Sequence, residues 1–125
     1  MRTMLKSKIH RARVTSVNLS YEGSISLDPL LMREADILAH EQVHILNLNN
    51  GQRFTTYAIE GKTGDVGLNG AAARLAQKGD IVIILTYSQV NEIDVASHVP
   101  SLVYVNRENR IIRTNHVPEL FEQEN

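Results

Sequence analysis

The chain has 125 residues, of which 42% are hydrophobic and 22% charged, and its net charge is −1. This balance predicts one globular domain over residues 1–125, without the basic surface that nucleic acid or an acidic membrane would attract. Cysteine is absent, which excludes disulfides, thiol nucleophiles and cysteine metal sites. The first residues turn polar before a signal peptide could form, and no apolar run reaches membrane-spanning length. We therefore expect a cytoplasmic protein.

Short apolar stretches predict a fold made mainly of β-strands. Apolar residues alternate at Ala12 and Val14 and again at Val17 and Leu19, and the change of phase between these pairs predicts a bulge or bend. Asn49-Asn50-Gly51 predicts a hairpin between strands near 43–48 and 53–59. The β-branched run over 81–85 is typical of a strand buried on both faces. Residues 101–106 and 110–114 predict one more pair.

Three short helices are expected between these strands. Asp28 as N-cap, with Pro29 at the first helical position, predicts a helix through about residue 36. Asn69-Gly70 opens a second one over 71–76, closed by Lys78-Gly79, and residues 91–98 form a third candidate. Many short strands with brief helices indicate a compact β-barrel whose strand order the pattern leaves open. We expect residues 115–125 to form a flexible tail.

The dipeptide Gly23-Ser24 offers chemistry that no encoded side chain supplies. A serine hydroxyl can attack the carbonyl of the preceding residue, and glycine leaves that approach unobstructed. The resulting ester can eliminate, and the dehydroalanine left behind hydrolyses to a pyruvoyl group, which is an electrophilic ketone. Most Gly-Ser dipeptides are simply turns, so the surrounding residues decide the interpretation.

Further sequence blocks accompany this dipeptide in a fixed order. The blocks are KIHRARVT at 8–15, YEGSISLD at 21–28, NGQRFTTYAI at 50–59, NGAAARL at 69–75 and GDIVII at 79–84. Together they resemble the pyruvoyl-dependent aspartate 1-decarboxylases of bacterial pantothenate synthesis. The resemblance runs from Met1 to about residue 105, and the tail from Asn106 carries little of it.

This resemblance implies a double-psi β-barrel, mainly β with short helices, that assembles as a homotetramer with sites between neighbouring subunits. It implies decarboxylation of L-aspartate to β-alanine and carbon dioxide, after autocatalytic cleavage at Gly23-Ser24 into chains 1–23 and 24–125. The implied cofactor is a pyruvoyl group made from Ser24, with no metal. A Schiff base between the substrate amine and this group would provide the electron sink for the Cα carbanion. Two points stay open: whether cleavage needs a maturation factor, and how strictly aspartate is preferred over glutamate.

The resemblance also implies roles for individual side chains. Arg53 and Lys8 would bind substrate carboxylate, for which a bidentate guanidinium is well shaped, and His10 would line the site. Thr56 would hydrogen-bond near the Gly23 carbonyl during self-cleavage, and Tyr57 would give a proton to Cα as a general acid. Without the resemblance, a surface ion pair, a strand threonine and a core tyrosine would be the favoured interpretations.

A helix start completes the predicted site. By the resemblance, Asn69, Gly70, Ala71 and Ala72 lie beside the substrate, where free backbone N–H groups favour an anion and small side chains allow close approach. A simple helix cap is the alternative, and both can hold.

The geometry of the 53–57 segment is harder to reconcile with these roles. In a strand, Arg53 and Tyr57 point to one face while Thr56 points to the other. A bend or a site shared between subunits would bring the three together, and the sequence leaves both options open.

A rival motif, His40-Glu41-Gln42-Val43-His44, fits the H-E-x-x-H pattern of zinc metalloproteases. That pattern needs a helix through His44, whereas the residues after it lead into the predicted hairpin, and a third ligand is missing in any usual place. We therefore interpret the motif as coincidence and the histidines as exposed. A barrel that only binds a partner or ligand is a third hypothesis, which a chain that stays intact on incubation would favour.

Overall fold

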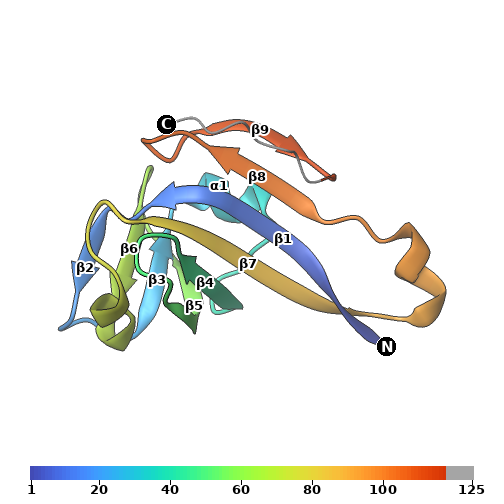
Figure 1. Ribbon diagram of the computed structural model, residues 1–125, viewed down its shortest axis with the longest axis horizontal. Coiled ribbons are helices and arrows are strands. Elements are labelled where there is room, and N and C mark those ends of the chain that lie inside the picture. Colours follow the sequence, from blue (N-terminus) through green and yellow to red (C-terminus); the bar gives the residue numbers. More distant parts are fainter. Residues whose placement is uncertain (118–125) are drawn as a thin grey trace.

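Residues 1–117 are described by the structure, a computed structural model in which β-strands dominate (Figure 1). Within them the strands are β1 (Arg2–Arg13), β2 (Ser16–Asn18), β3 (Ser24–Leu27), β4 (Gln42–Asn47), β5 (Arg53–Glu60), β6 (Val66–Asn69), β7 (Ile81–Val90), β8 (Ser101–Val105) and β9 (Ile111–Asn115). The helical segments are α1 (Pro29–Glu34) and the 3-10 helices η1 (Gly70–Leu75) and η2 (Glu92–Ser97). The expected class, mainly β with short helices, is confirmed.

The strands form one mixed sheet in the order β2-β6-β3-β5-β4-β7-β1-β8-β9. β1 pairs antiparallel with β7 and parallel with β8, whereas β3 lies between parallel β5 and antiparallel β6. Figure 1 shows β1 and β7 as a long pair, with β2 to β6 gathered at one end and β9 along the outer edge. This mixture of parallel and antiparallel neighbours is consistent with a double-psi β-barrel.

Alternation along the strands separates a core face from an outer face, because successive strand residues point to opposite sides. In β4, Val43 and Ile45 are fully buried, while His44 and Leu46 are half-buried. In β5, Ala58 is fully buried, whereas Arg53, Thr55 and Tyr57 are exposed. The predicted hairpin between these two strands is confirmed, and so is the pair formed by β8 and β9.

The irregularity in the first strand lies earlier than the sequence predicts. The register of β1 against β7 shifts between Leu5 and Ser7 and again between Ile9 and Ala12, and Arg11 has a φ of +66°. Between β1 and β2 the chain instead changes partners: Val14 N–H donates to the Asp80 carbonyl and Thr15 N–H to the Val66 carbonyl. The phase change in the sequence therefore marks the point where the chain changes its hydrogen-bonding partner, not a bulge.

The predicted helices occur, with different ends. The Asp28 side chain caps α1 by accepting from Leu30 N–H at 2.8 Å, as expected, and α1 ends at Glu34. The second segment is a 3-10 helix that ends at Leu75, before the predicted stop at Lys78-Gly79. Gly79 instead has a φ of +95° and donates its N–H to the Val14 carbonyl, so it belongs to a separate turn.

The strand over 81–85 is less buried than predicted. Val82 and Ile84 are fully buried, but Ile81 and Ile83 on the opposite face are only half-buried. On that face only Leu85 is buried, so burial on both faces is confirmed only in part for the single chain. Of the predicted tail over 115–125, Asn115 is the last residue of β9, and residues 118–125 lie outside the described residues. No helix in the described part of the chain is long and apolar enough to cross a membrane.

Candidate active site

Ser24 is the first residue of β3 and is 1% exposed, although Gly23 before it is exposed. The Ser24 hydroxyl donates to the Glu22 carbonyl at 3.2 Å and accepts a hydrogen bond of 2.9 Å from Nδ2 of Asn69. The first contact directs the hydroxyl toward the 22–24 segment, and the second joins it to β6. A buried amide therefore holds the predicted nucleophile next to the bond it would cleave.

Asn69 reaches Ser24 because the two residues are partners in the antiparallel β3–β6 pair. Its Nδ2 also donates to Oγ of Ser26 at 3.1 Å, and its side chain makes no cap hydrogen bond to η1. Asn69 therefore occupies the N-cap position of η1, but its side chain does not cap the helix. Asn69 faces the predicted cleavage site instead.

Gly70 allows the chain to fold back on Gly23. Its φ is +64°, and a Cβ built on it would lie 2.6 Å from both Cα and N of Gly23 and 3.0 Å from the Tyr21 carbonyl oxygen. Real Cβ atoms essentially never approach backbone atoms so closely, so a side chain here would displace the 21–23 segment. Glycine at residue 70 is thus required both by its backbone conformation and by this close approach.

A pocket of about 390 Å³ opens at Gly23. Its lining includes the predicted site residues Thr56, Tyr57, Ala71 and Ala72. Phe54, Thr55 and Leu75 also line it, and the sequence argument assigned them no role. The sequence did hold a signal for Phe54 and Thr55, because both lie between the predicted site residues Arg53 and Thr56 on one short strand. The structure therefore brings most of the predicted residues together within one chain.

Arg53 does not line the pocket at Gly23. It lines an adjoining pocket of about 130 Å³ whose wall includes Phe54 and Thr55, which also line the first pocket. Lys8 lies farther away on β1, opposite Leu85 of β7 and Leu102 of β8. The two predicted carboxylate-binding cations thus occupy the sheet beside the cleavage site, not the pocket itself.

His10 also lies away from Gly23. It is opposite Tyr104 of β8, and their rings make an edge contact with centroids 5.5 Å apart. Burial, reinforced by the positive charges of Lys8, Arg11 and Arg113, lowers the pKa of His10 from 6.5 to about 4. The imidazole is therefore neutral near pH 7, where it offers one donor and one acceptor nitrogen.

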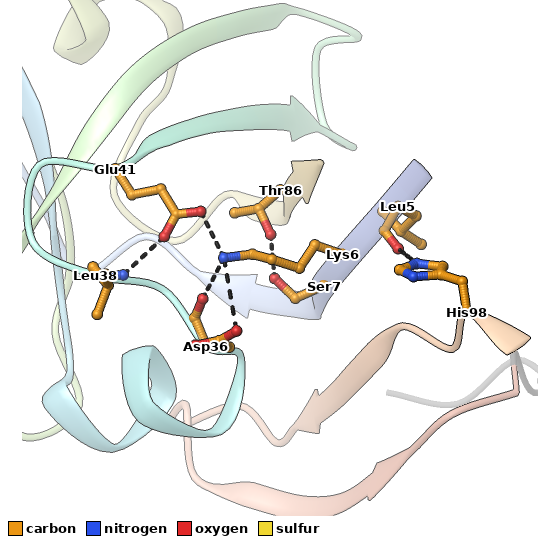
Figure 2. A network of polar contacts seen from close by, with 8 residues as sticks. All are labelled: Leu5, Lys6, Ser7, Asp36, Leu38, Glu41, Thr86 and His98. Carbon is orange, nitrogen blue, oxygen red and sulfur yellow. Dashed lines mark hydrogen bonds and ion pairs between the residues drawn. The ribbon is translucent and has the colours of Figure 1, made fainter. Parts of the chain in front are cut away.

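The H-E-x-x-H motif does not form a metalloprotease site. His40 has a φ of +75°, and the following residues belong to β4, so the helix that the motif requires is absent over 40–44. Figure 2 shows that Glu41 serves another purpose: it accepts from Lys6 Nζ at 2.6 Å and from Leu38 N–H at 2.9 Å. Among the described residues no group of three or more His, Asp or Glu side chains could hold a metal ion.

Comparison with known proteins identifies the family of the chain. A family model described as aspartate decarboxylase matches residues 1–112. The chain belongs to the aspartate decarboxylase family. Two curated relatives, each named aspartate 1-decarboxylase, illustrate the similarity. One from Dehalococcoides mccartyi strain 195 is 55% identical over 88% of this chain and 90% of its own length, and one from Staphylococcus aureus strain JH9 is 50% identical over 95% of both.

This family membership gives the cleavage-site geometry its meaning. The match includes Gly23, Ser24, Asn69 and Gly70, and it ends at residue 112, so the C-terminal tail contributes little to it. A member of this family is expected to act on an amino acid, although none of its own encoded side chains is an electrophile. The buried hydroxyl of Ser24 lies within the matched residues.

Proposed function

We propose that this chain is a lyase that converts L-aspartate to β-alanine and carbon dioxide, for pantothenate biosynthesis, and that its cofactor is a pyruvoyl group derived from Ser24. The family match and the two named relatives support the reaction. One observation carries the cofactor assignment: the Ser24 hydroxyl is buried, held by Asn69 and turned back toward the Gly23 segment.

Self-cleavage would begin at this hydroxyl. Oγ of Ser24 attacks the Gly23 carbonyl carbon, the peptide C–N bond breaks, and an ester to Gly23 and a free amine on residue 24 result. Loss of the Ser24 Cα proton then expels the Gly23 carboxylate and leaves dehydroalanine. Addition of water and loss of ammonia complete the conversion and give chains 1–23 and 24–125. Thr56, which lines the same pocket as Gly23, is the residue that we assign to the Gly23 carbonyl.

The residues around Ser24 fit a pyruvoyl group. The pocket at Gly23 is open enough for a small amino acid, and Ala71 and Ala72 leave space along its wall. When present, the pyruvoyl ketone supplies the electron sink that decarboxylation requires. The chain's own residues then bind and protonate: Arg53 would hold a carboxylate through charge-assisted hydrogen bonds, with Lys8 on the same sheet, and Tyr57 would deliver a proton to Cα from the pocket wall.

A homotetramer with sites between subunits would explain the placement of the remaining residues. Arg53 and Tyr57 lie on the exposed face of β5, and Ile83 on β7 is incompletely buried in one chain. Exposed apolar side chains also occur at Leu19, Tyr21 and Leu48. A second subunit would cover such surface and could bring His10 and Lys8 to a neighbouring Gly23. Light scattering on the purified protein tests the tetramer, and the cytoplasmic location stays a prediction from the sequence.

The proposed function is tested by the mass of the purified protein. We expect two chains, 1–23 and 24–125, with the long chain blocked at its N-terminus, and a Ser24→Ala protein that stays one chain and forms no β-alanine. Incubation of the purified protein alone also decides whether a maturation factor is needed. A Ser24→Ala protein that still splits at this bond, or a cleaved protein that leaves aspartate unchanged, would contradict the proposal.

A further inference from the structure

His44 lies in a row of side chains that crosses the outer face of the sheet. Lys8 of β1 is opposite Leu85 of β7, Leu85 is opposite His44 of β4, and His44 is opposite Thr55 of β5. Residues opposite one another on paired strands point to the same face. The imidazole of His44 therefore shares a sheet face with the ammonium group of Lys8.

Arg53 is a second cation on that face. It is opposite Leu46, which is two residues after His44 on the same strand, so both pairs point outward. Arg53 and His44 line the same pocket of about 130 Å³, together with Leu46, Phe54, Thr55, Leu85 and Tyr87. This lining contains a guanidinium, an imidazole and two hydroxyl groups, and no carboxylate. It is small compared with the roughly 300–1,000 Å³ of sites for drug-sized ligands, so it suits a single anionic group.

Two contacts fix the His44 ring in this pocket. Its Nδ1 lies 3.4 Å from Oγ1 of Thr55, and its ring meets Tyr87 edge to face, with centroids 5.1 Å apart and an interplanar angle of 88°. When the Thr55 hydroxyl donates to Nδ1, the ring proton resides on Nε2. Nε2–H is then a hydrogen-bond donor, and a carboxylate oxygen can accept from it.

We propose that His44 is a specificity-determining residue, which binds the carboxylate that the substrate keeps. This inference rests on the proposed function. Decarboxylation removes the α-carboxylate, and a cationic pocket would stabilise that group before the reaction and so hinder its departure. The retained side-chain carboxylate is bound equally before and after the reaction. The pocket of Arg53 and His44 adjoins the pocket at Gly23 through Phe54 and Thr55, so it can hold this group while Cα lies near residue 24.

The decisive comparison is between His44→Phe and His44→Gln in the processed enzyme. Phenylalanine keeps an aromatic ring against Tyr87 but has no donor, whereas glutamine keeps an N–H donor. We expect His44→Phe to raise KM for aspartate about tenfold, with kcat within about threefold of the parent, and His44→Gln to recover most of the loss. Calorimetry with succinate, which has both carboxylates but no amine to react, should show the same weakening of binding.

Self-cleavage separates a failure of this inference from a failure of the proposed function. Both His44 variants should split between Gly23 and Ser24 like the parent, and His116→Phe, a change at the far edge beyond β9, should leave KM unchanged. If His44→Phe is cleaved normally but binds aspartate and succinate as the parent does, the inference is wrong and the proposed function stands. A lower kcat with unchanged KM would also overturn it. If the parent does not decarboxylate aspartate, the proposed function fails, and the succinate affinities still decide whether His44 binds a carboxylate.

Discussion

Gly70 lies against Gly23 so closely that a side chain at residue 70 would collide with the backbone at the proposed cleavage site. A Cβ on Gly70 would be 2.6 Å from Cα of Gly23, and Gly70 itself has a φ of +64°. The two glycines therefore act together. The first leaves the carbonyl open to attack, and the second allows the backbone after β6 to pass beside it.

Gly70→Ala should slow self-cleavage by at least tenfold, because the 21–23 segment must move away from the Ser24 hydroxyl. The matched control is Gly79→Ala. Gly79 also has a positive φ, +95°, but a Cβ there would meet nothing within 4 Å, so this change carries only the backbone strain of about 1–2 kcal/mol. The cleaved fraction is followed over time on denaturing gels. Equal cleavage rates in the two variants would contradict the role assigned to the close approach.

Asn69→Ala should also slow cleavage, because Ser24 loses the amide that positions its hydroxyl. Removing a hydrogen bond of this kind costs about 0.5–1.5 kcal/mol, which corresponds to roughly two- to twelvefold in rate if it acts on the reactive geometry. Ser26→Ala is the control, since it removes the second acceptor of Asn69 and leaves the bond to Ser24. Both proteins are compared by intact mass during incubation. The role of Asn69 would be refuted if the two variants matured at the same rate.

Tyr57→Phe should mature normally and turn over slowly. The ring that lines the pocket stays, while the proton donor is lost, and a positioned general acid typically contributes roughly 10²–10⁴-fold to rate. Steady-state β-alanine formation gives kcat, and aspartate trapped on the long chain by borohydride gives substrate capture. Trapping should stay close to the parent level. Normal turnover would remove Tyr57 from its assigned role and leave Ser24 in its own.

Glu41→Gln should destabilise the fold more than Glu92→Gln. The Lys6–Glu41 pair is 2.6 Å long with side chains only 22% and 24% exposed, and Glu41 also holds Leu38 N–H (Figure 2). The Arg2–Glu92 pair is 64% and 62% exposed. We expect a loss of about 1.5–3 kcal/mol for the first change and about 0–1 kcal/mol for the second. Chemical denaturation at pH 7 measures both, and similar losses would show that burial of the Lys6–Glu41 pair is unimportant.

His10 should make the protein acid-sensitive. Its pKa is lowered to about 4 in the folded chain, mainly by burial, against 6.5 when unfolded. Between pH 4 and 6.5 the unfolded chain binds more protons at His10 than the folded chain does. The stability that the neutral, buried His10 contributes is therefore complete above pH 6.5 and decreases as the pH falls toward 4. His10→Phe keeps a ring beside Tyr104 and cannot titrate. Melting temperatures at pH 7 and pH 4.5 should differ less in this variant than in the parent, and equal differences would contradict the assignment.

Local patterns in the sequence were sufficient for many elements. Asp28 and Pro29 specify the start of α1 through contacts within one turn, and Asn49-Asn50-Gly51 specifies the β4–β5 hairpin through its turn geometry. Alternation in the 53–57 segment correctly predicted that Arg53 and Tyr57 are more exposed than Thr56, although Thr56 and Tyr57 line the same pocket. These features depend on residues close together in the chain, which is why periodicity and turn chemistry predict them.

The site itself depends on contacts between distant segments. Asn69 approaches Ser24 only because β6 pairs with β3, and Gly70 meets Gly23 for the same reason. The sequence assigned no role to His44, and its place beside Arg53 follows from the registers of β4 with β5 and β7. The sequence by itself determined the family and the strand and turn signals, and it singled out the dipeptide Gly23-Ser24. Only the tertiary structure decided which side chains surround that dipeptide, because strand pairing and register bring together residues that local pattern cannot relate.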